Sequence, residues 1–296
     1  MTPQATDLYD ELTCRNRGFL PPETQGRLRA ATVLVAGCGS TGGAAVEPLV
    51  RLGVQDFVLA DNGTYELNNL NRQSAAQADV GAYKAEVCAR HVAEVNPHAR
   101  TRVDTDGIRP GTVRGMVAAC DVVIDGVDVT EAAGWRAKYA LHEAAAELGR
   151  PVISGYDMAG TQYVRFYDYR RTSAPFDGAV TREQVEAGAT WRLLRQAVPL
   201  RVVPVEMLES ARRAVASGDG SVSQLVYTSM LFGALASRMV VDVLDGRPVR
   251  RHTVVDVHRA VRPPASALRA RLRKPWVAAL ALRDLAVLER GPGRRR

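Results

Sequence analysis

Short apolar runs and amphipathic segments alternate along the first half of the chain. Between the apolar runs, residues 41–52, 81–95 and 131–148 carry hydrophobic positions at helical spacing. The apolar runs, which have the length and composition of buried strands, are residues 31–36, 56–60, 121–125 and 151–155, with a shorter strand at 101–104. Alternation of strands and helices predicts a doubly wound, Rossmann-like α/β fold with a mostly parallel sheet.

The pattern changes in the C-terminal half. Residues 162–169 alternate between polar and apolar positions, as in an antiparallel strand with one solvated face. A crossover segment, 171–204, contains prolines and glycines, and we expect one short helix in it, near 181–197. Further helices are expected at 204–216 and 222–244, followed by a turn at Asp245-Gly246 and a last strand at 253–258. These strands predict an antiparallel extension of the parallel sheet.

Composition supports one globular domain with a basic tail. We divide the 296 residues into an N-terminal arm (1–30), a nucleotide-type α/β domain (31–263) and a basic C-terminal helix or tail (264–296). The net charge of +7 resides in that tail, which has nine basic and two acidic residues. The tail could contact nucleic acid or acidic partners, although a solvated helix is the commoner reading of such a segment.

The chain shows no membrane or secretory signal by these criteria. No apolar run approaches the roughly 18 residues of a membrane span, and the first residues have no basic and apolar leader. We therefore expect a cytoplasmic protein without a membrane partner. The four cysteines are scattered and form no CxxC pair, which favours reduced thiols that pack as small apolar residues.

A glycine loop follows the first predicted strand. Gly37, Gly39 and Gly42 form a GxGxxG pattern between that strand and a helix, where backbone N–H groups and the helix N-terminus bind phosphate. Asp61 ends the second strand about 20 residues later, the usual position of a carboxylate that binds ribose hydroxyls. Dehydrogenases, methyltransferases and adenylating enzymes all use this loop, so it indicates a nucleotide and leaves the reaction open.

A polar cassette follows Asp61. It reads Asp-Asn-Gly-Thr-Tyr-Glu-Leu-Asn-Asn-Leu-Asn-Arg-Gln from 61 to 73, and Gly81-Ala-Tyr-Lys84 comes after it. This cassette resembles the nucleotide site of the ThiF/MoeB/HesA superfamily, relatives of the ubiquitin-activating enzymes. The resemblance extends over roughly residues 15–260 and includes Asn96-Pro97 and the long helix, Asp-Gly turn and strand near the end.

The resemblance implies an ATP-dependent adenylyltransferase, in which a substrate carboxylate attacks the α-phosphate of ATP and pyrophosphate leaves. By that resemblance Asp61 holds the ribose, and the triphosphate contacts Asn69, Arg72 and Lys84. Asp128 brings in Mg²⁺. Arg17 reaches the γ-phosphate of the partner subunit's ATP, which requires a homodimer, although Arg15 or Arg27 could serve instead. Arginine, lysine and a metal ion are also what nucleotidyl transfer needs, because pyrophosphate leaves only when its charge is neutralised.

The chain departs from the family pattern at three places. Val129 follows Asp128 where the family usually has asparagine, so an amide contact on the adenine or phosphate side is missing. The paired CxxC motifs of many members are also missing, so we expect no structural zinc. No cysteine follows Cys120, so we expect no enzyme thioester. Cys38 and Cys88 lie near the predicted ATP site, and we interpret both as packing residues. A role in small-molecule or peptide biosynthesis is therefore favoured over activation of a sulfur carrier.

Substrate walls and alternative functions complete the expectations. Beside the nucleotide we expect residues 155–158 and the side chains Arg165, Tyr167, Tyr169, Arg170 and Arg171 to form the substrate pocket, although the tyrosines could equally pack within the sheet. The alternatives are an NAD-dependent Rossmann oxidoreductase, a tRNA-directed ThiF-like dehydratase that uses the basic tail, and a non-catalytic nucleotide-binding scaffold. An oxidoreductase leaves Arg72, Lys84 and Asp128 unexplained.

Overall fold

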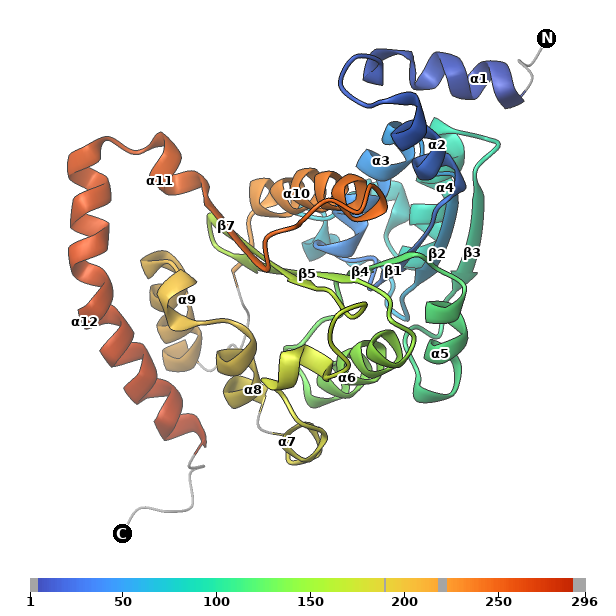
Figure 1. Cartoon of the computed structure of the whole chain (residues 1–296). Helices are drawn as coiled ribbons and strands as arrows, with labels where there is room; N and C mark the ends of the chain where they lie inside the picture. The colour runs from blue at the N-terminus through green and yellow to red at the C-terminus, as the bar shows by residue number, and fades with distance from the viewer. Residues whose placement is uncertain (1–4, 189, 218–222, 290–296) are drawn as a thin grey trace.

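The computed structural model describes residues 5–188, 190–217 and 223–289, and its centre is a seven-stranded sheet (Figure 1). The strand order is β3-β2-β1-β4-β5-β6-β7. The strands are β1 (Thr32–Ala36), β2 (Asp56–Ala60), β3 (Arg100–Asp104), β4 (Val122–Asp125), β5 (Val152–Met158), β6 (Thr161–Tyr167) and β7 (His252–Asp256). Strands β1 to β5 are parallel, whereas β6 is antiparallel to both neighbours. The predicted Rossmann-like sheet with an antiparallel extension is confirmed.

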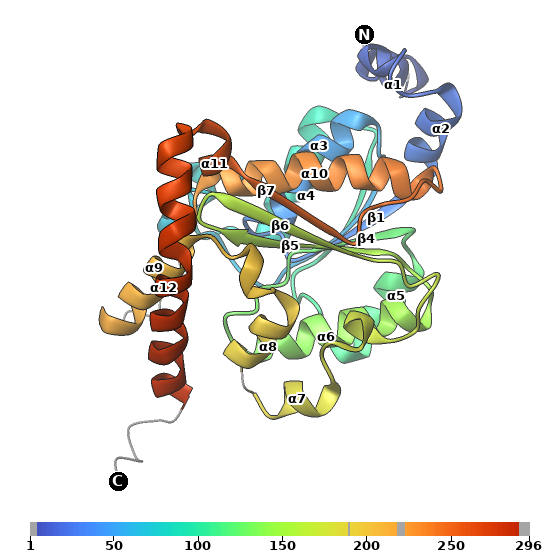
Figure 2. The ribbon, with the colours of Figure 1, turned by 60° about the vertical axis from the view of Figure 1, so that its left-hand side comes forward.

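Helices cover both faces of the sheet (Figure 2). On one face lie α3 (Gly42–Leu52), α4 (Lys84–Val95) and α10 (Val226–Leu244), and on the other lie α5 (Pro110–Ala118) and α6 (Ala132–Glu147). Side chains of β1 alternate between the two layers, since Val33 and Val35 pack with the first group and Leu34 with the second. A strand buried on both faces must be apolar at every position, which explains the continuous run in the sequence.

The N-terminal arm and the crossover region contain helices that the sequence did not resolve. The arm forms α1 (Ala5–Leu12) and α2 (Pro22–Ala30). Helix α5, which lies between β3 and β4, was also not predicted from the sequence. The single helix expected near 181–197 is wrong: α7 (Arg182–Glu186) and α8 (Thr190–Ala197) are separate. Gly188 between them has a φ of +71°, which ends α7 in a left-handed turn.

Helix α10 begins later than the sequence analysis predicts. Its expected start at residue 222 lies outside the described residues, and the helix itself begins at Val226. Within the described ranges it is the one helix long and apolar enough to cross a membrane by length and composition. It packs against α3 and the sheet, and Phe232, Ala236 and Val240 are fully buried there. Burial inside the domain accounts for its apolar character.

The basic C-terminal segment is more than a solvated helix. Helix α12 (Pro264–Glu289) packs against α9 (Val205–Ser217), which is preceded by η5 (Leu200–Val202), while α11 (Val257–Val261) joins α12 to β7 (Figure 1). Val277, Ala278 and Ala281 meet Val205 and Leu208 in a small apolar cluster. The arginines at 294–296 lie outside the described residues. The division into arm, domain and tail stays a prediction.

Candidate nucleotide site

The predicted nucleotide residues come from adjacent strand ends. In the order β2-β1-β4-β5, Asp61 follows β2, the glycine loop follows β1, and Asp128 lies three residues after β4. Because these strands are parallel, their carboxyl ends lie at one edge of the sheet, where α/β proteins bind ligands. The structure thus brings Asp61, the glycine loop and Asp128 to one edge.

The glycine loop is held tightly against the segment after β4. Gly37 has a φ of +84°, and a Cβ there would lie 2.5 Å from the carbonyl oxygen of Gly126. A Cβ on Gly42 would collide with the carbonyl oxygen of Gly37. Gly39 faces open space instead, and its nearest neighbour would be the Gln73 amide, 3.9 Å away. Only glycine fits the two tight positions, and the open side at Gly39 suits a phosphate group.

Asp61 ties two loops together. Its Oδ2 accepts a hydrogen bond from the Cys38 N–H at 2.6 Å, and its Oδ1 accepts one from the Gly63 N–H at 2.7 Å. Lys84 is the first residue of α4, and its Nζ lies 5.9 Å from the centroid of the Tyr65 ring. A Cβ at Gly63 would be 3.4 Å from that Nζ. The ammonium group therefore lies over the loop that Asp61 anchors.

Arg72 lies between the loop of the cassette and two carboxylates. Its Nη1 donates to the Asn68 carbonyl oxygen and to Asn71 Oδ1, both at 2.8 Å. Burial lowers the pKa of Arg72, while the nearby charges of Asp128 and Asp157 raise it. Its Nε is buried and makes no hydrogen bond within the described part of the chain. A buried donor without a partner is costly, and a bound anion would satisfy it.

The side chains of Asn69 and Gln73 have different surroundings in the cassette. The Asn69 side chain is buried and serves its own turn, accepting from the Glu66 N–H at 3.2 Å and donating to Asn68 Oδ1 at 2.6 Å. Its contact with phosphate stays a prediction. The sequence assigns no role to Gln73, yet its side-chain amide faces Gly39. Its Oε1 is buried and has no partner among the residues described.

Asp128 is exposed at this edge. Its Oδ1 accepts a hydrogen bond from the Thr130 N–H at 2.9 Å. The chain that leads to it is fixed by Asp125, at the end of β4, whose Oδ1 accepts from the Val127 N–H at 3.2 Å. Asp125 thus positions the loop that presents Asp128.

A buried network surrounds Asp125, and the sequence analysis did not find it. Asp125 Oδ2 receives Lys138 Nζ at 2.5 Å, Ser154 Oγ at 2.5 Å and His142 Nε2 at 3.0 Å. All four side chains are at most 1% exposed. Burial raises the pKa of Asp125, but the Lys138 charge and the His142 hydrogen bond outweigh it and hold that pKa well below the usual range.

The hydrogen bonds fix the state of His142. A carboxylate only accepts, so His142 Nε2 carries the proton toward Asp125. Its Nδ1, 2.7 Å from the Tyr169 hydroxyl, then accepts from that hydroxyl, which itself accepts from the Phe176 N–H at 2.8 Å. Burial lowers the pKa of His142, in agreement with a neutral ring. The network therefore connects the Asp128 loop to the crossover segment without a second buried cation.

Arg17 lies away from the site of its own chain. The neighbouring Asn16 donates to the carbonyl oxygen of Leu52, at the end of α3 opposite the glycine loop. Eleven helical residues separate these ends, a length of about 15 Å. Arg17 is exposed there beside Phe19, which is 89% exposed. The structure does not bring Arg17 together with Arg72, Lys84 and Asp128.

Most of the residues predicted to line the substrate pocket lie away from the nucleotide site. Strand β6 runs back from the site, so Tyr167 pairs with Val152 at the far edge of the sheet, and residues 169–171 follow it there. Tyr156, Tyr167 and Tyr169 are core residues, and Arg165 is bonded to Asp177. The prediction of an arginine-rich pocket from these residues is wrong. Of the predicted walls, Gly155 and Asp157 remain at the site edge, and a Cβ on Gly155 would collide with Thr41 of the glycine loop.

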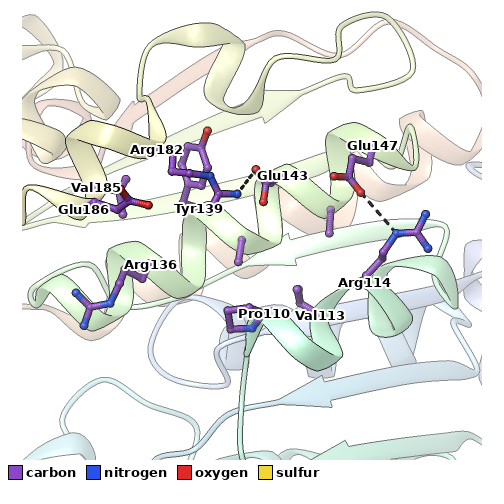
Figure 3. Close-up of a pocket in the computed structure, with 12 residues that line it drawn as sticks. Pro110, Val113, Arg114, Arg136, Tyr139, Glu143, Glu147, Arg182, Val185 and Glu186 are labelled. Atoms are coloured by element: carbon purple, nitrogen blue, oxygen red, sulfur yellow. Dashed lines mark hydrogen bonds and ion pairs between the residues drawn. The ribbon is translucent and has the colours of Figure 1, made fainter.

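One hollow of the surface lies away from this edge. It has a volume of about 330 Å³ and is formed by α5, α6 and α7 (Figure 3). Arg182 pairs with Glu143 and Arg114 with Glu147 across it, so four of its charged side chains are already paired. None of the predicted nucleotide residues lines it.

The cysteines near the site behave as packing residues. Cys38 and Cys88 are buried, with Cys88 Sγ 4.0 Å from the Cys38 carbonyl oxygen. The pKa of Cys38 is raised well above its ordinary value, chiefly by its interaction with the Cys88 thiol and next by burial. A raised pKa disfavours the reactive thiolate. The described residues contain no cluster of three or more His, Cys, Asp or Glu side chains suited to a metal ion.

Similarity to solved structures agrees with this fold. E. coli MccB, solved with ATP, superposes with a TM-score of 0.61 at 16% identity, covering 86% of this chain and 70% of that one. E. coli tRNA N6-threonylcarbamoyladenosine dehydratase, TcdA, gives a TM-score of 0.59 at 20% identity and covers 82% of this chain and 98% of that one. At these identities the likeness shows the fold alone and does not favour a tRNA substrate.

Sequence relatives identify the family. The SAMP-activating enzyme E1 of Haloferax volcanii is 33% identical over 135 residues, 45% of this chain and 48% of that protein. Protein HesA, vegetative, of Trichormus variabilis is 33% identical over 104 residues, 35% of this chain and 39% of its own length. The chain spans about half or less of the length of several curated relatives that it matches. The ThiF family matches residues 13–259, close to the predicted 15–260. The chain therefore belongs to the ThiF family, whose members are ATP-dependent adenylyltransferases.

Proposed function

We propose that this chain binds ATP at the candidate nucleotide site and activates a substrate carboxylate as an acyl-AMP. One observation carries the proposal. Three neighbouring strand ends supply a ribose-type carboxylate (Asp61), a phosphate-type glycine loop, and an exposed acid (Asp128), with Arg72 and Lys84 beside them. Such a set matches a nucleoside triphosphate better than a dinucleotide, because NAD gives Arg72 and Lys84 no triphosphate to neutralise.

The residues fit the chemistry of ATP. A carboxylate oxygen of the substrate attacks the α-phosphorus, and the bond from that phosphorus to the bridging oxygen of the β-phosphate breaks. Pyrophosphate leaves with the electron pair, and the charges of Arg72 and Lys84 stabilise it. The buried Arg72 Nε and Gln73 Oε1, which lack partners in the described part of the chain, support a polar ligand at this place.

Asp128 fits a Mg²⁺ ion. Mg²⁺ usually binds through one or two carboxylates together with substrate phosphates and water, so a single exposed carboxylate beside the glycine loop is sufficient. The ion would supply charge neutralisation on the triphosphate. The role of Asp125 is to hold the 126–128 segment so that Asp128 faces that position.

The acyl-AMP is proposed to pass to an external or intramolecular nucleophile, in small-molecule or peptide biosynthesis. No cysteine follows Cys120 that could take the acyl group as a thioester. We further propose a homodimer in which Arg17 acts on the partner's ATP. Its distance from its own site and the exposed Phe19 beside it support a role across an interface.

ATP–pyrophosphate exchange with a panel of carboxylic acids and peptide C-termini tests the proposal. Exchange that depends on one class of acid, with an AMP adduct detected by mass spectrometry, is the expected result. Lys84→Met and Asp128→Ala should each lower the exchange rate at least about 100-fold, whereas the distant surface variant Glu94→Gln should not. NAD-dependent fluorescence change without ATP binding would favour the oxidoreductase, and tight ATP binding without exchange would favour a scaffold.

A further inference from the structure

A carboxylate that the proposed reaction does not use lies at the same edge of the sheet. Asp157 is the penultimate residue of β5 and is partly exposed. Ser229 of α10 donates to its Oδ2 at 3.3 Å. The hydroxyls of Ser40 and Thr41 in the glycine loop lie close to the carboxylate, yet its Oδ1 is buried and has no hydrogen bond of normal geometry from any described residue. A buried carboxylate oxygen without a donor is costly, and a donor on a bound substrate would satisfy it.

The strand order places Asp157 on the acyl side of the nucleotide. Asp61 on β2 fixes the ribose end, the glycine loop on β1 holds phosphates, and Asp128 follows β4. Strand β5 is the next neighbour, about 4.8 Å farther from the ribose. The acid to be activated must reach the α-phosphate from a side that the ribose and the leaving phosphates do not occupy. The end of β5 is that side, and Asp157 faces it beside Ser40 and Thr41.

The charge of Asp157 decides which acids can lie there. A carboxylate at this position repels the anionic substrate carboxylate. The charge of Arg72 acts on Asp157, but Arg72 is shared with Asp128. Burial raises the pKa of Asp157 to about 6, against smaller opposing contributions from the neighbouring hydroxyls of Ser229, Ser40 and Thr41 and from the Arg72 charge. Above that pKa the Asp157 carboxylate is ionised, so a substrate acid without an amine meets a like charge. An acid that also carries an ammonium group brings its own counter-ion.

We propose that Asp157 is a specificity-determining residue that accepts a hydrogen bond from an ammonium group of the substrate, so that the chain activates an amine-bearing carboxylic acid. The inference rests on the proposed adenylation. The ammonium group donates to Oδ1, and Ser229 keeps the carboxylate turned toward the site. The substrate is then held at both ends, by its carboxylate near the α-phosphate and by its amine at Asp157.

The experiment compares matched acids, each amino acid with its desamino analogue, in ATP–pyrophosphate exchange. Wild-type protein should prefer the amine-bearing acid, and Asp157→Asn should reduce that preference about 10- to 100-fold, the size expected for one charged hydrogen bond. The loss should come from KM for the acid, with kcat and KM for ATP nearly unchanged. Ser229→Ala should give a smaller loss in the same direction, and Glu94→Gln none. An unchanged preference in Asp157→Asn would overturn the inference.

Two further measurements distinguish a folding defect, or a failure of the proposed adenylation, from a failure of the inference about Asp157. Asparagine has nearly the shape of aspartate, and ATP binding by Asp157→Asn reports an intact nucleotide site. If the wild type binds ATP but exchanges with no acid, adenylation fails. Calorimetric titration of the ATP-bound protein with the same acid pairs then decides the role of Asp157. Equal affinity of wild type and Asp157→Asn for the amine-bearing acid contradicts it, and selective loss in the variant supports it.

Discussion

Replacing Lys138 by methionine removes the cation that balances the most deeply buried carboxylate near the site. Lys138 Nζ lies 2.5 Å from Asp125 Oδ2, and the two side chains are 1% and 0% exposed. Methionine keeps most of the volume, so the cost is the charge left on Asp125. Breaking one partner out of a buried ion pair costs about 3–5 kcal/mol. In a domain of this size that lowers Tm by about 10 °C.

The loss should depend on pH with a defined sign. In the wild type the pKa of Asp125 is depressed, so its contribution to stability is full at neutral pH and disappears only when the pH falls through that low value. Without Lys138, burial raises the pKa of Asp125. The Lys138 charge is also one cause of the lowered pKa of His142, so the ring protonates more easily in the variant. Both effects reduce the deficit as pH falls from about 7.5 toward 5.

Urea unfolding and thermal melts of Lys138→Met at these two pH values measure the effect. Lys84→Met is the matched control, because its lysine is half-buried at the nucleotide site and its loss should cost less than about 1 kcal/mol. Asp125→Asn in the Lys138→Met background should recover part of the stability. Equal melting temperatures for the two lysine variants, or a deficit that grows toward pH 5, would refute the reasoning.

Three further predictions concern the site. Gly42→Ala should abolish ATP binding in equilibrium titration, because its Cβ would collide with the Gly37 carbonyl oxygen. Mixing inactive Arg17→Ala and Lys84→Met subunits should restore about a quarter of the exchange activity if Arg17 acts in trans in a twofold dimer, and no recovery would exclude that. Asp157→Asn should stabilise the fold at pH 7.5 by about 2 kcal/mol in urea unfolding, a gain that vanishes below pH 4, because a raised carboxyl pKa means that ionisation opposes folding.

The sheet and the nucleotide loop could be predicted because their signals are local. A strand covered on both faces is apolar throughout, and a glycine loop between strand and helix has a fixed sequence order. Helix α5 carries weaker local signals, since Gly111 and Gly115 reduce its helical propensity. The substrate-pocket residues predicted around Tyr167 were misplaced because β5 and β6 form a hairpin that reverses the direction of the chain. The sequence does not show at which edge of the sheet the residues of each strand lie.

The Asp125 network shows the limit of reading motifs alone. Its members come from β4, α6 and β5, and only the folded sheet brings them together. One signal was present: Lys138 and His142 are four residues apart on α6, on the face that also buries Trp135 and Leu141. Two polar side chains on the apolar face of a helix indicate a buried partner. Asp157 falls within residues 155–158, which the sequence places at the substrate pocket, but its contacts could not be predicted because its neighbours in the glycine loop and α10 are remote in sequence.

Transfer of an oxygen atom tests the central claim most directly. An acid that supports exchange is labelled with ¹⁸O in its carboxylate and incubated with the protein, ATP and hydroxylamine as the nucleophile. If the carboxylate attacks the α-phosphorus, its oxygen becomes the bridge of the acyl-AMP. Attack of hydroxylamine on the acyl carbon then leaves that oxygen on AMP. The account predicts one ¹⁸O in AMP and none in pyrophosphate, and unlabelled AMP or formation of ADP and phosphate would contradict it.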